Sequence, residues 1–380
     1  MAKLFFSYYL FVSIVLCVFF TYSKRYQMPF DYELIFSVYE VAYYSAYLCV
    51  GYLFFILSYK FSFKSSVSKK GYNLKGDFNP RPRLFVFLFV QIAIVIYFLT
   101  RLVSGVEYTN GEQYIQDYRP LGDKVSNLVL LIQSFLIFTV WRKPVFIFIL
   151  LVLSALIAFL FAWIDSSRAS ILPLVGLLYY FYKERNIFPG VVVLIYLIFC
   201  YMIAMVGRSF TDRIDFHSLN EIVSLTMYKF DEVLVWVVSY FTAFSVYQFA
   251  YITRDTLGDF TWYDFFYSIT PLPSFAWPYI PDYENWRADE FRPMGAVSEV
   301  YRVSPLMLFV YFGFKGFLAK AIDSMSNDIA RLFAVVIFIM TVVMMFQYNL
   351  RSTQWFYYLI ALLYFLERGG FIERSRRFAL

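Results

Sequence analysis

Arginines and carboxylates at the ends of apolar segments are the residues of this sequence whose types and spacing could do chemistry. Asp165 and Arg168 interrupt a long apolar region in the stretch WIDSSRAS, Arg208 follows an apolar run, and Glu299 precedes one. The planar guanidinium of arginine binds phosphate oxygens in pairs, whereas lysine acts as a point charge. These residues therefore predict a site for a phosphate-bearing ligand, with a carboxylate facing the same layer.

The elements that must position these residues are membrane-spanning helices. The chain has 380 residues, of which 61% are hydrophobic and 16% charged, whereas about a quarter of a soluble domain is charged. Apolar runs long enough to cross a hydrocarbon layer of roughly 30 Å recur from end to end. The first run, 4–22, has no small-residue cleavage site after it, which indicates a retained helix. The sequence predicts an all-α polytopic membrane protein.

About ten transmembrane helices are expected, and the distribution of Lys and Arg orients them. The segment 59–83 carries seven basic residues and one acidic residue, so it is expected on the cytoplasmic side, as are both termini. The predicted crossings are 4–22, 34–58, 84–104, 126–141, 144–163, 169–182, 187–206, 303–320, 331–349 and 353–367.

The apolar segment Asp231–Ile252 does not fit this scheme. If it crossed the membrane, the acidic stretch 253–302 would lie inside and the Arg-rich tail outside, which inverts the charge rule. We therefore expect it to lie along the outer leaflet or to re-enter. The resulting organisation has N-terminal helices in 1–206, a large external loop in 207–302, and C-terminal helices with a cytoplasmic tail in 303–380.

The region Val145–Tyr182 is expected to form a helical hairpin, because its 38 residues match two crossings of about 20 residues each. Asp165 and Arg168 then lie in the external turn. A helix N-terminus beside an arginine suits an anion, above all phosphate. The alternative is an ordinary turn in which Arg168 pairs with Asp165 or reaches lipid head groups.

Arginine is enriched on the expected external side, where it accounts for 11 of 14 basic residues. An arginine within hydrocarbon is costly and usually has a partner. A diphosphate at the outer surface is one such partner, and lipid phosphates are the alternative. The arginines expected at external helix ends are Arg101, Arg168, Arg208, Arg302 and Arg351.

The external segment 268–305 holds six of the thirteen prolines, so we expect ordered but irregular chain over the external mouth. Trp277 and Trp286 could stack on sugar rings next to carboxylates, or they could belong to an interfacial aromatic belt. Glu299 and Tyr301 close the segment just before a crossing. A salt bridge from Glu299 to Arg302 or Arg292 is the structural alternative to a chemical role.

Other chemistries lack a sequence signature. His217 is the one histidine, and Cys17, Cys49 and Cys200 lie inside apolar runs, where packing is the expected role. No metal-ligand spacing and no Gly-rich phosphate loop is present, so neither metal nor cofactor is expected. The net charge of +6 follows from the topology and does not indicate nucleic acid.

The chain resembles the O-antigen polymerase family, which joins lipid-linked oligosaccharide repeat units for lipopolysaccharide. The resemblance is carried by DSSRAS at an external hairpin, by GRSF at the outer end of a helix, and by RPMGAVSEVYRVSPLMLFVYFGFKG after a large loop. It implies a glycosyltransferase fold of the C type (GT-C) in the inner membrane, an undecaprenyl diphosphate-linked oligosaccharide donor and no metal. A chain-length regulator is the implied protein partner, beside membrane lipid.

The resemblance also implies roles for individual residues. Without a metal, arginines would stabilise the departing diphosphate, and Glu299 would take the proton of the acceptor hydroxyl. Arg168 and Arg208 are the first choices for this stabilisation. The substrate-binding candidates are Arg292, Arg302, Tyr301, Arg101, Trp277 and Trp286.

Three other functions compete with the polymerase. A lipid-linked oligosaccharide flippase would show two similar halves and charges at the bilayer midplane, and no repeat of this kind is found. An O-antigen ligase carries a functional histidine in its late external loop, whereas His217 lies much earlier. A scaffold protein would not need arginines grouped at helix ends.

Overall fold

The computed structural model describes residues 2–23, 37–62, 87–98, 130, 133, 136, 144–164, 172–207, 216–255, 261–271, 295–346 and 350–369. Within these ranges the secondary structure is helical and contains no strand. The helices belong to two compact units, one formed by Met1–Leu74 with Val238–Leu380 and the other by Lys75–Val237. We call them unit 1 and unit 2.

Unit 1 combines the two ends of the sequence. Its helices are α1 (Ala2–Ser23), α2 (Val38–Phe61), α10 (Ala243–Asp255), α11 (Trp262–Ile269), α12 (Ala296–Val303), α13 (Pro305–Ser324), α14 (Asp328–Met344) and α15 (Leu350–Arg368). Unit 2 contains α5 (Pro144–Ile164), α6 (Leu172–Lys183), α7 (Ile187–Gly207), α8 (Phe216–Tyr228) and the larger part of α9 (Phe230–Phe241).

Five helices of the described chain are long and apolar enough to cross a membrane, which is the pattern of a multi-pass membrane protein. A sixth is added if the bent pair Phe230–Tyr240 and Ala243–Ala250, which meet at 49°, is counted as one broken span. This pair covers most of the segment Asp231–Ile252, for which a re-entrant or interfacial position stays a prediction, since a broken span has the same form. The five helices span Ala2–Tyr22, Val38–Phe61, Val145–Ile164, Ile187–Gly207 and Pro305–Ser324.

The remaining expected crossings have different outcomes. The expected crossing 353–367 is covered by α15, whose 19 residues are long enough to span but do not belong to the five most apolar long helices. The segment 126–141 lies almost entirely outside the described residues. The expected crossing 169–182 corresponds to α6, whose 12 residues reach only about 18 Å. The described helix within 84–104 covers Phe87–Phe98, and the apolar part of α14 covers Ala330–Met344. The number of ten crossings therefore stays a prediction.

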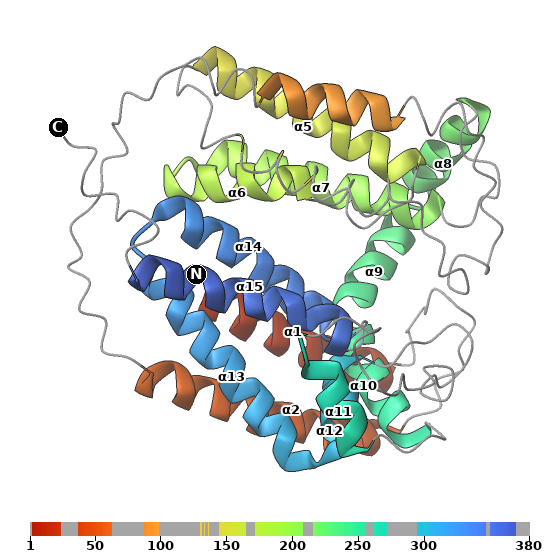
Figure 1. Cartoon of the computed structure of the whole chain (residues 1–380). Coiled ribbons are helices and arrows are strands. Elements are labelled where there is room, and N and C mark those ends of the chain that lie inside the picture. Colours follow the sequence, from red (N-terminus) through yellow and green to blue (C-terminus); the bar gives the residue numbers. More distant parts are fainter. Residues whose placement is uncertain are drawn as a thin grey trace. The chain divides into compact units, whose positions relative to one another are not determined.

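Helices α2 and α13 pack against each other in unit 1 (Figure 1). A Cβ atom at Gly316 would clash with the carbonyl of Phe55, and one at Gly51 would lie 3.1 Å from the ring of Phe312. Glycine at these two positions permits a close approach of the two helix backbones. Buried aromatic rings also pack at this contact. The ring of Phe6 of α1 stacks on that of Phe55, and the two centroids are 4.2 Å apart.

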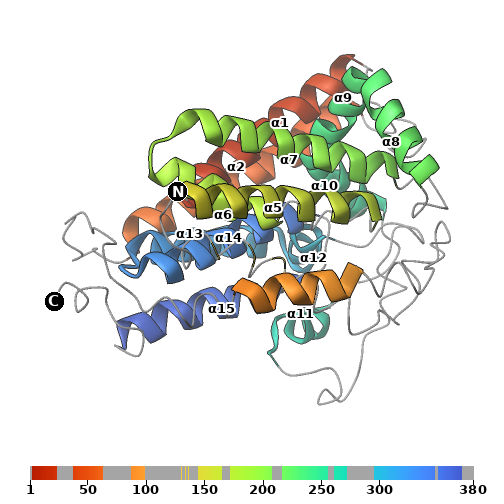
Figure 2. The ribbon, with the colours of Figure 1, turned by 90° about the horizontal axis from the view of Figure 1, so that it is seen from above.

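In unit 2, α5, α6 and α7 pack side by side in both ribbon views (Figures 1 and 2). Polar side chains join α5 to two earlier apolar segments of the chain, at positions 91 and 133. Gln91 Nε2 donates to Gln133 Oε1 at 2.6 Å, and Gln133 Nε2 donates to Ser154 Oγ at 3.1 Å. Such bonds between otherwise apolar helices are typical of helix association in lipid.

The segment 268–305 is not irregular at its described C-terminal end. Residues Ala296–Val303 form α12, with Gly295 at its N-cap. The expectation of irregular chain is wrong here because it rested on proline density, and the stretch AVSEVYRV contains no proline. Helix α12 therefore leads directly into the spanning helix α13. It carries the candidate residues Glu299, Tyr301 and Arg302.

Candidate functional site

Helix α12 is held against the end of α14 by its first residues. The backbone N–H of Val297 donates to the carbonyl of Met345 at 3.1 Å, and a Cβ atom at Gly295 would clash with the backbone of Phe346. Ala296, Val297 and Val300 are buried in the core of unit 1. This docking leaves the side chain of Glu299 facing the interior.

Glu299 is a buried carboxyl group with few hydrogen-bond donors. Its side chain is 1% exposed, Oε2 accepts from the N–H of Leu350 at 2.7 Å, and Oε1 has no partner among the described residues. The ion pair with Arg302 that we considered does not form. Burial raises the pKa of Glu299 to about 8, against the lowering effect of the Leu350 N–H and with a further rise from Asp264.

Asp264 is the second carboxyl group of this site, and the sequence analysis missed it. It is 7% exposed, and its Oδ2 accepts from the N–H and the hydroxyl of Thr261, each at 2.7 Å. These bonds form a capping box at the start of α11. Asp264 and Glu299 are 35 positions apart in the sequence, so no local pattern could have paired them.

Arg351 fixes α11 to α15. Its guanidinium lies 4.0 Å from the ring centroid of Tyr267 and donates to the carbonyl oxygen of Tyr267. Gln354 Nε2 donates to the carbonyl of Thr270 at 2.9 Å, and the hydroxyl of Tyr358 donates to that of Ile269. Arg351 therefore joins α15 to α11 through Tyr267, although we expected it among the anion-binding arginines.

Tyr301, two positions after Glu299 on α12, belongs to a cluster of tyrosines. Its ring meets that of Tyr47 edge-on at 5.0 Å and that of Phe249 at 5.5 Å, while the hydroxyls of Tyr43 and Tyr47 are 3.1 Å apart. Burial, and then the hydrogen bond with Tyr47, raises the pKa of Tyr301. The cluster brings ring faces and hydroxyls together, as contact with a sugar or a lipid head group would require.

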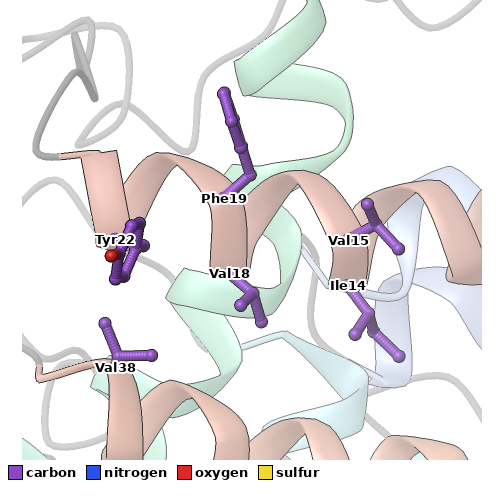
Figure 3. A pocket seen from close by; sticks show the side chains of 6 residues that line it. All are labelled: Ile14, Val15, Val18, Phe19, Tyr22 and Val38. Atoms are coloured by element: carbon purple, nitrogen blue, oxygen red, sulfur yellow. The ribbon is translucent and has the colours of Figure 1, made fainter.

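An apolar groove of about 440 Å³ opens where α1 ends and α2 begins (Figure 3). It is lined by Ile14, Val15, Val18, Phe19, Tyr22 and Val38. The side chains of Phe19 and Tyr22 are 57% and 78% exposed. The groove offers hydrocarbon contact only and brings no chemical group to the site.

A second group missed by the sequence analysis is Lys315, in the middle of α13. It is fully buried, and its Nζ donates to the hydroxyl of Tyr357 at 2.9 Å. The hydroxyls of Tyr357 and Tyr311 are 2.6 Å apart. A lysine inside the apolar stretch LMLFVYFGFKGFLAK was the available signal, because ionisable residues within spanning segments are usually functional.

The other predicted residues are not assembled around Glu299 by the described structure. Arg302 lies three positions after Glu299 on α12 and is half-buried. His217 is exposed on α8 and faces Glu221 at 3.1 Å, as a surface residue would. Cys17 and Cys200 are buried as expected, whereas Cys49 is exposed. Arg101, Arg168, Arg208, Arg292, Trp277 and Trp286 lie outside the described residues.

Comparisons of this chain with family models, with curated proteins and with solved structures found no match. Its own geometry supplies a carboxyl group on the short helix that precedes a spanning helix. Burial raises the pKa of this group to about 8, and one of its oxygens has no partner among the described residues. Such a group can hold or accept a proton near neutral pH.

Proposed function

We propose that this chain is a polysaccharide polymerase of the O-antigen type, a metal-independent glycosyltransferase of the inner membrane. It would transfer a growing glycan from undecaprenyl diphosphate to an incoming lipid-linked repeat unit. In this proposal α1 and α13 are oriented so that α12 lies at the outer face, with both termini cytoplasmic. The fold would be of the GT-C type, and membrane lipid and a chain-length regulator would be its partners.

The carboxyl group of Glu299 carries this proposal. A hydroxyl of the incoming unit would attack the anomeric carbon of the growing glycan, the bond to the diphosphate would break, and Glu299 would take the hydroxyl proton. A pKa of about 8 suits a general base, because catalytic bases work best with a pKa near the operating pH. Glu299 Oε1 has no partner among the described residues, so this oxygen can accept the proton.

The departing diphosphate needs positive charge when no metal supplies it. In this proposal Arg168 and Arg208 bind the diphosphate, with Arg292 and Arg302 beside them. Tyr301, Arg101, Trp277 and Trp286 would contact the sugars. Arg302 is the member on the same short helix as Glu299, which supports a shared site for proton transfer and charge stabilisation.

The experiment compares two buried glutamates in a strain that lacks this gene. The strain is complemented with wild type, Glu299→Gln or Glu367→Gln, and the surface polysaccharide is resolved by length. Glu367 is a matched control because it is 6% exposed and also has one unbonded oxygen in the described structure. Loss of a general base costs about 10²–10⁴ in rate, so Glu299→Gln should leave single repeat units.

Glu367→Gln should retain the polymer ladder once membrane levels are equalised. An unchanged ladder in Glu299→Gln at normal membrane levels would refute the assigned base. Arg168→Lys tests the diphosphate contact in the same assay, because lysine cannot form the paired bonds of a guanidinium. We expect Arg168→Lys to leave single repeat units as well.

One observation favours a flippase as the second candidate. Lys315 is buried in the middle of a spanning helix, which is where transporters place charges. The two functions differ in what their loss leaves behind. Without a polymerase, single repeat units reach the cell surface, whereas without a flippase no repeat unit does, so the same gel separates them.

A further inference from the structure

Two lysines from opposite ends of the sequence lie over the same tyrosine ring. Lys3 is on α1 and Lys320 is on α13, and their Nζ atoms are 5.0 and 5.3 Å from the ring centroid of Tyr59 on α2. The two nitrogen atoms are therefore at most 10.3 Å apart. The start of α1 and the ends of α2 and α13 meet at this end of unit 1 (Figure 1).

Hydrogen bonds between the three helices hold this arrangement in place. The hydroxyl of Tyr59 donates to Asp323 Oδ2 at 2.9 Å, which joins the end of α2 to the end of α13. The hydroxyl of Tyr52 donates to Ser7 Oγ at 2.8 Å, and Ser7 Oγ donates to the carbonyl of Lys3 at 2.8 Å. These two bonds join α2 to the first turn of α1. The backbone positions of both lysines are thus fixed relative to the ring between them.

The positive charge around the Tyr59 ring exceeds the negative charge that the described residues bring to it. Neither Lys3 nor Lys320 forms an ion pair with a described residue, and Lys60 adds a third ammonium group next to Tyr59 in the sequence. Asp323 is the one carboxylate bonded to the ring hydroxyl. The first turn of α1 has no acidic residue, although a helix dipole disfavours a cation there. A bound anion would reduce the repulsion between these like charges.

The preference of basic residues for the cytoplasmic side explains why lysines occur at this end, which is cytoplasmic in the orientation that we propose. It does not explain why two of them share one ring. Each contact with the ring face is favourable, but together the contacts place two like charges near each other. This arrangement is suited to a ligand that carries negative charge.

The surface beside the two lysines is apolar, which indicates the rest of the ligand. Leu4 directly follows Lys3, Leu57 is two positions before Tyr59, and both leucines are exposed, as is Tyr8 on α1. A lipid with a charged phosphate and hydrocarbon chains matches both parts of this surface, whereas free phosphate would contact the lysines alone. Basic pockets between transmembrane helices on the cytoplasmic side bind anionic lipid head groups.

We propose that Lys3 and Lys320 bind the phosphate of an anionic phospholipid, whose acyl chains lie along the exposed apolar residues of α1 and α2. Tyr59 positions the two ammonium groups, and its bond to Asp323 holds the ring in place. The lipid is a structural ligand that joins α1 to α13, which come from opposite ends of the sequence. This inference does not rest on the proposed polymerase, because it concerns the end of α13 that lies farther from α12.

The test measures lipid binding to the full chain in detergent by native mass spectrometry. The probe is phosphatidylglycerol, and phosphatidylcholine with the same acyl chains is the control without net charge. We expect phosphatidylglycerol to bind more tightly than phosphatidylcholine, and an excess of inorganic phosphate should not displace it. Lys3→Met and Lys320→Met should each weaken the binding of phosphatidylglycerol about fivefold, because each removes one lysine from the head group.

Lys60→Met is the matched control. Lys60 is at the same end of α2, but it is exposed and is not one of the two lysines over the ring of Tyr59. This variant should keep the wild-type affinity for phosphatidylglycerol.

Three results would overturn the proposal. Equal binding of the two lipids by wild type would show that charge is not recognised. An equal loss of affinity in Lys60→Met and Lys320→Met would show a general attraction of this surface for anions. Displacement of the lipid by inorganic phosphate would show that the site takes free phosphate. If Lys320→Met does not fold, unchanged binding by Lys3→Met overturns the proposal.

Discussion

Glu299 and Glu367 place the same side chain in two different surroundings within unit 1. Glu367 Oε1 accepts from the N–H and hydroxyl of Ser326 and from the N–H of Asn327, just before α14 begins. Glu299 accepts from one backbone N–H and has Asp264 as its neighbour. Burial with one donor and a like charge nearby favours the protonated form of Glu299. Glu367 instead has a structural role, because its oxygen accepts three hydrogen bonds just before a helix.

The largest expected effect is on the pH dependence of stability. The pKa of Glu299 is raised from 4.5 to about 8 in the folded chain, so its contribution to stability is complete below about pH 4.5 and is lost as pH rises to about 8. The loss is at most about 5 kcal/mol at 1.36 kcal/mol for each pKa unit. Glu299→Gln cannot ionise. Its melting temperature minus that of wild type should therefore rise with pH over this range.

The measurement is thermal unfolding in detergent, followed by tryptophan fluorescence. If the difference in melting temperature between Glu299→Gln and wild type is the same at about pH 5 and about pH 9, Glu299 does not ionise over this range in the folded protein.

The next effect concerns the anchoring of α12. In Gly295→Ala, the added Cβ meets the backbone of Phe346, so α12 must move, and we expect a loss of about 3 kcal/mol. Gly313→Ala is the matched control, because the nearest atom to its Cβ would be 4.0 Å away. Alanine in a helix interior is favoured over glycine by up to about 1 kcal/mol, so this variant should be as stable as wild type or slightly more so. Equal losses would show that α12 is not rigidly held.

The rate of polymerisation should rise with pH if Glu299 is the general base. With a pKa of about 8, the ionised fraction increases roughly tenfold between about pH 7 and pH 9. Initial rates with a lipid-linked repeat unit in membranes would measure this. The residual rate of Glu299→Gln should be independent of pH in the same range. A rate that falls with rising pH would indicate that Glu299 acts in its protonated form.

The smallest effect is expected at Arg351. Arg351→Lys loses the planar contact with the ring of Tyr267, which costs about 1 kcal/mol. Arg368→Lys is the control, because Arg368 is exposed and its guanidinium is 5.4 Å from the ring of Tyr364. Thermal unfolding should separate the two variants by a few degrees. If they are equal, the contact between α11 and α15 does not depend on the guanidinium.

The sequence predicted the class of fold because long apolar runs have few other outcomes. It also singled out Glu299, because a carboxylate directly before a spanning helix stands out among apolar residues. It did not predict where the helices within these apolar runs begin and end. Within the expected crossing 169–182 the described helix is α6, which starts at Leu172, and the expected irregular chain before Pro305 contains α12. Hydropathy measures how apolar a run is, whereas a helix end depends on caps and packing.

The sequence could not predict the pairing of Asp264 with Glu299 or of Lys315 with Tyr357, for a physical reason. Asp264 acts electrostatically on Glu299 from α11, which packs on α12 and α15, and Lys315 meets Tyr357 across two helices. Such contacts depend on helix rotation and depth, which one chain's pattern does not encode. The position of Lys315 within an apolar run was visible, but a lysine alone does not reveal whether it faces lipid or a neighbouring tyrosine.

The glycine contact between α2 and α13 also constrains how the protein is made. The two helices are separated by more than half of the chain, and unit 2 lies between them in the sequence. During synthesis α2 enters the membrane long before α13 has been made. Until then, the face of α2 that carries Gly51 contacts lipid. Completion of unit 1 is then a late event, and nascent chains that end before Pro305 should be cleaved by proteases more readily than those that extend past Ser324.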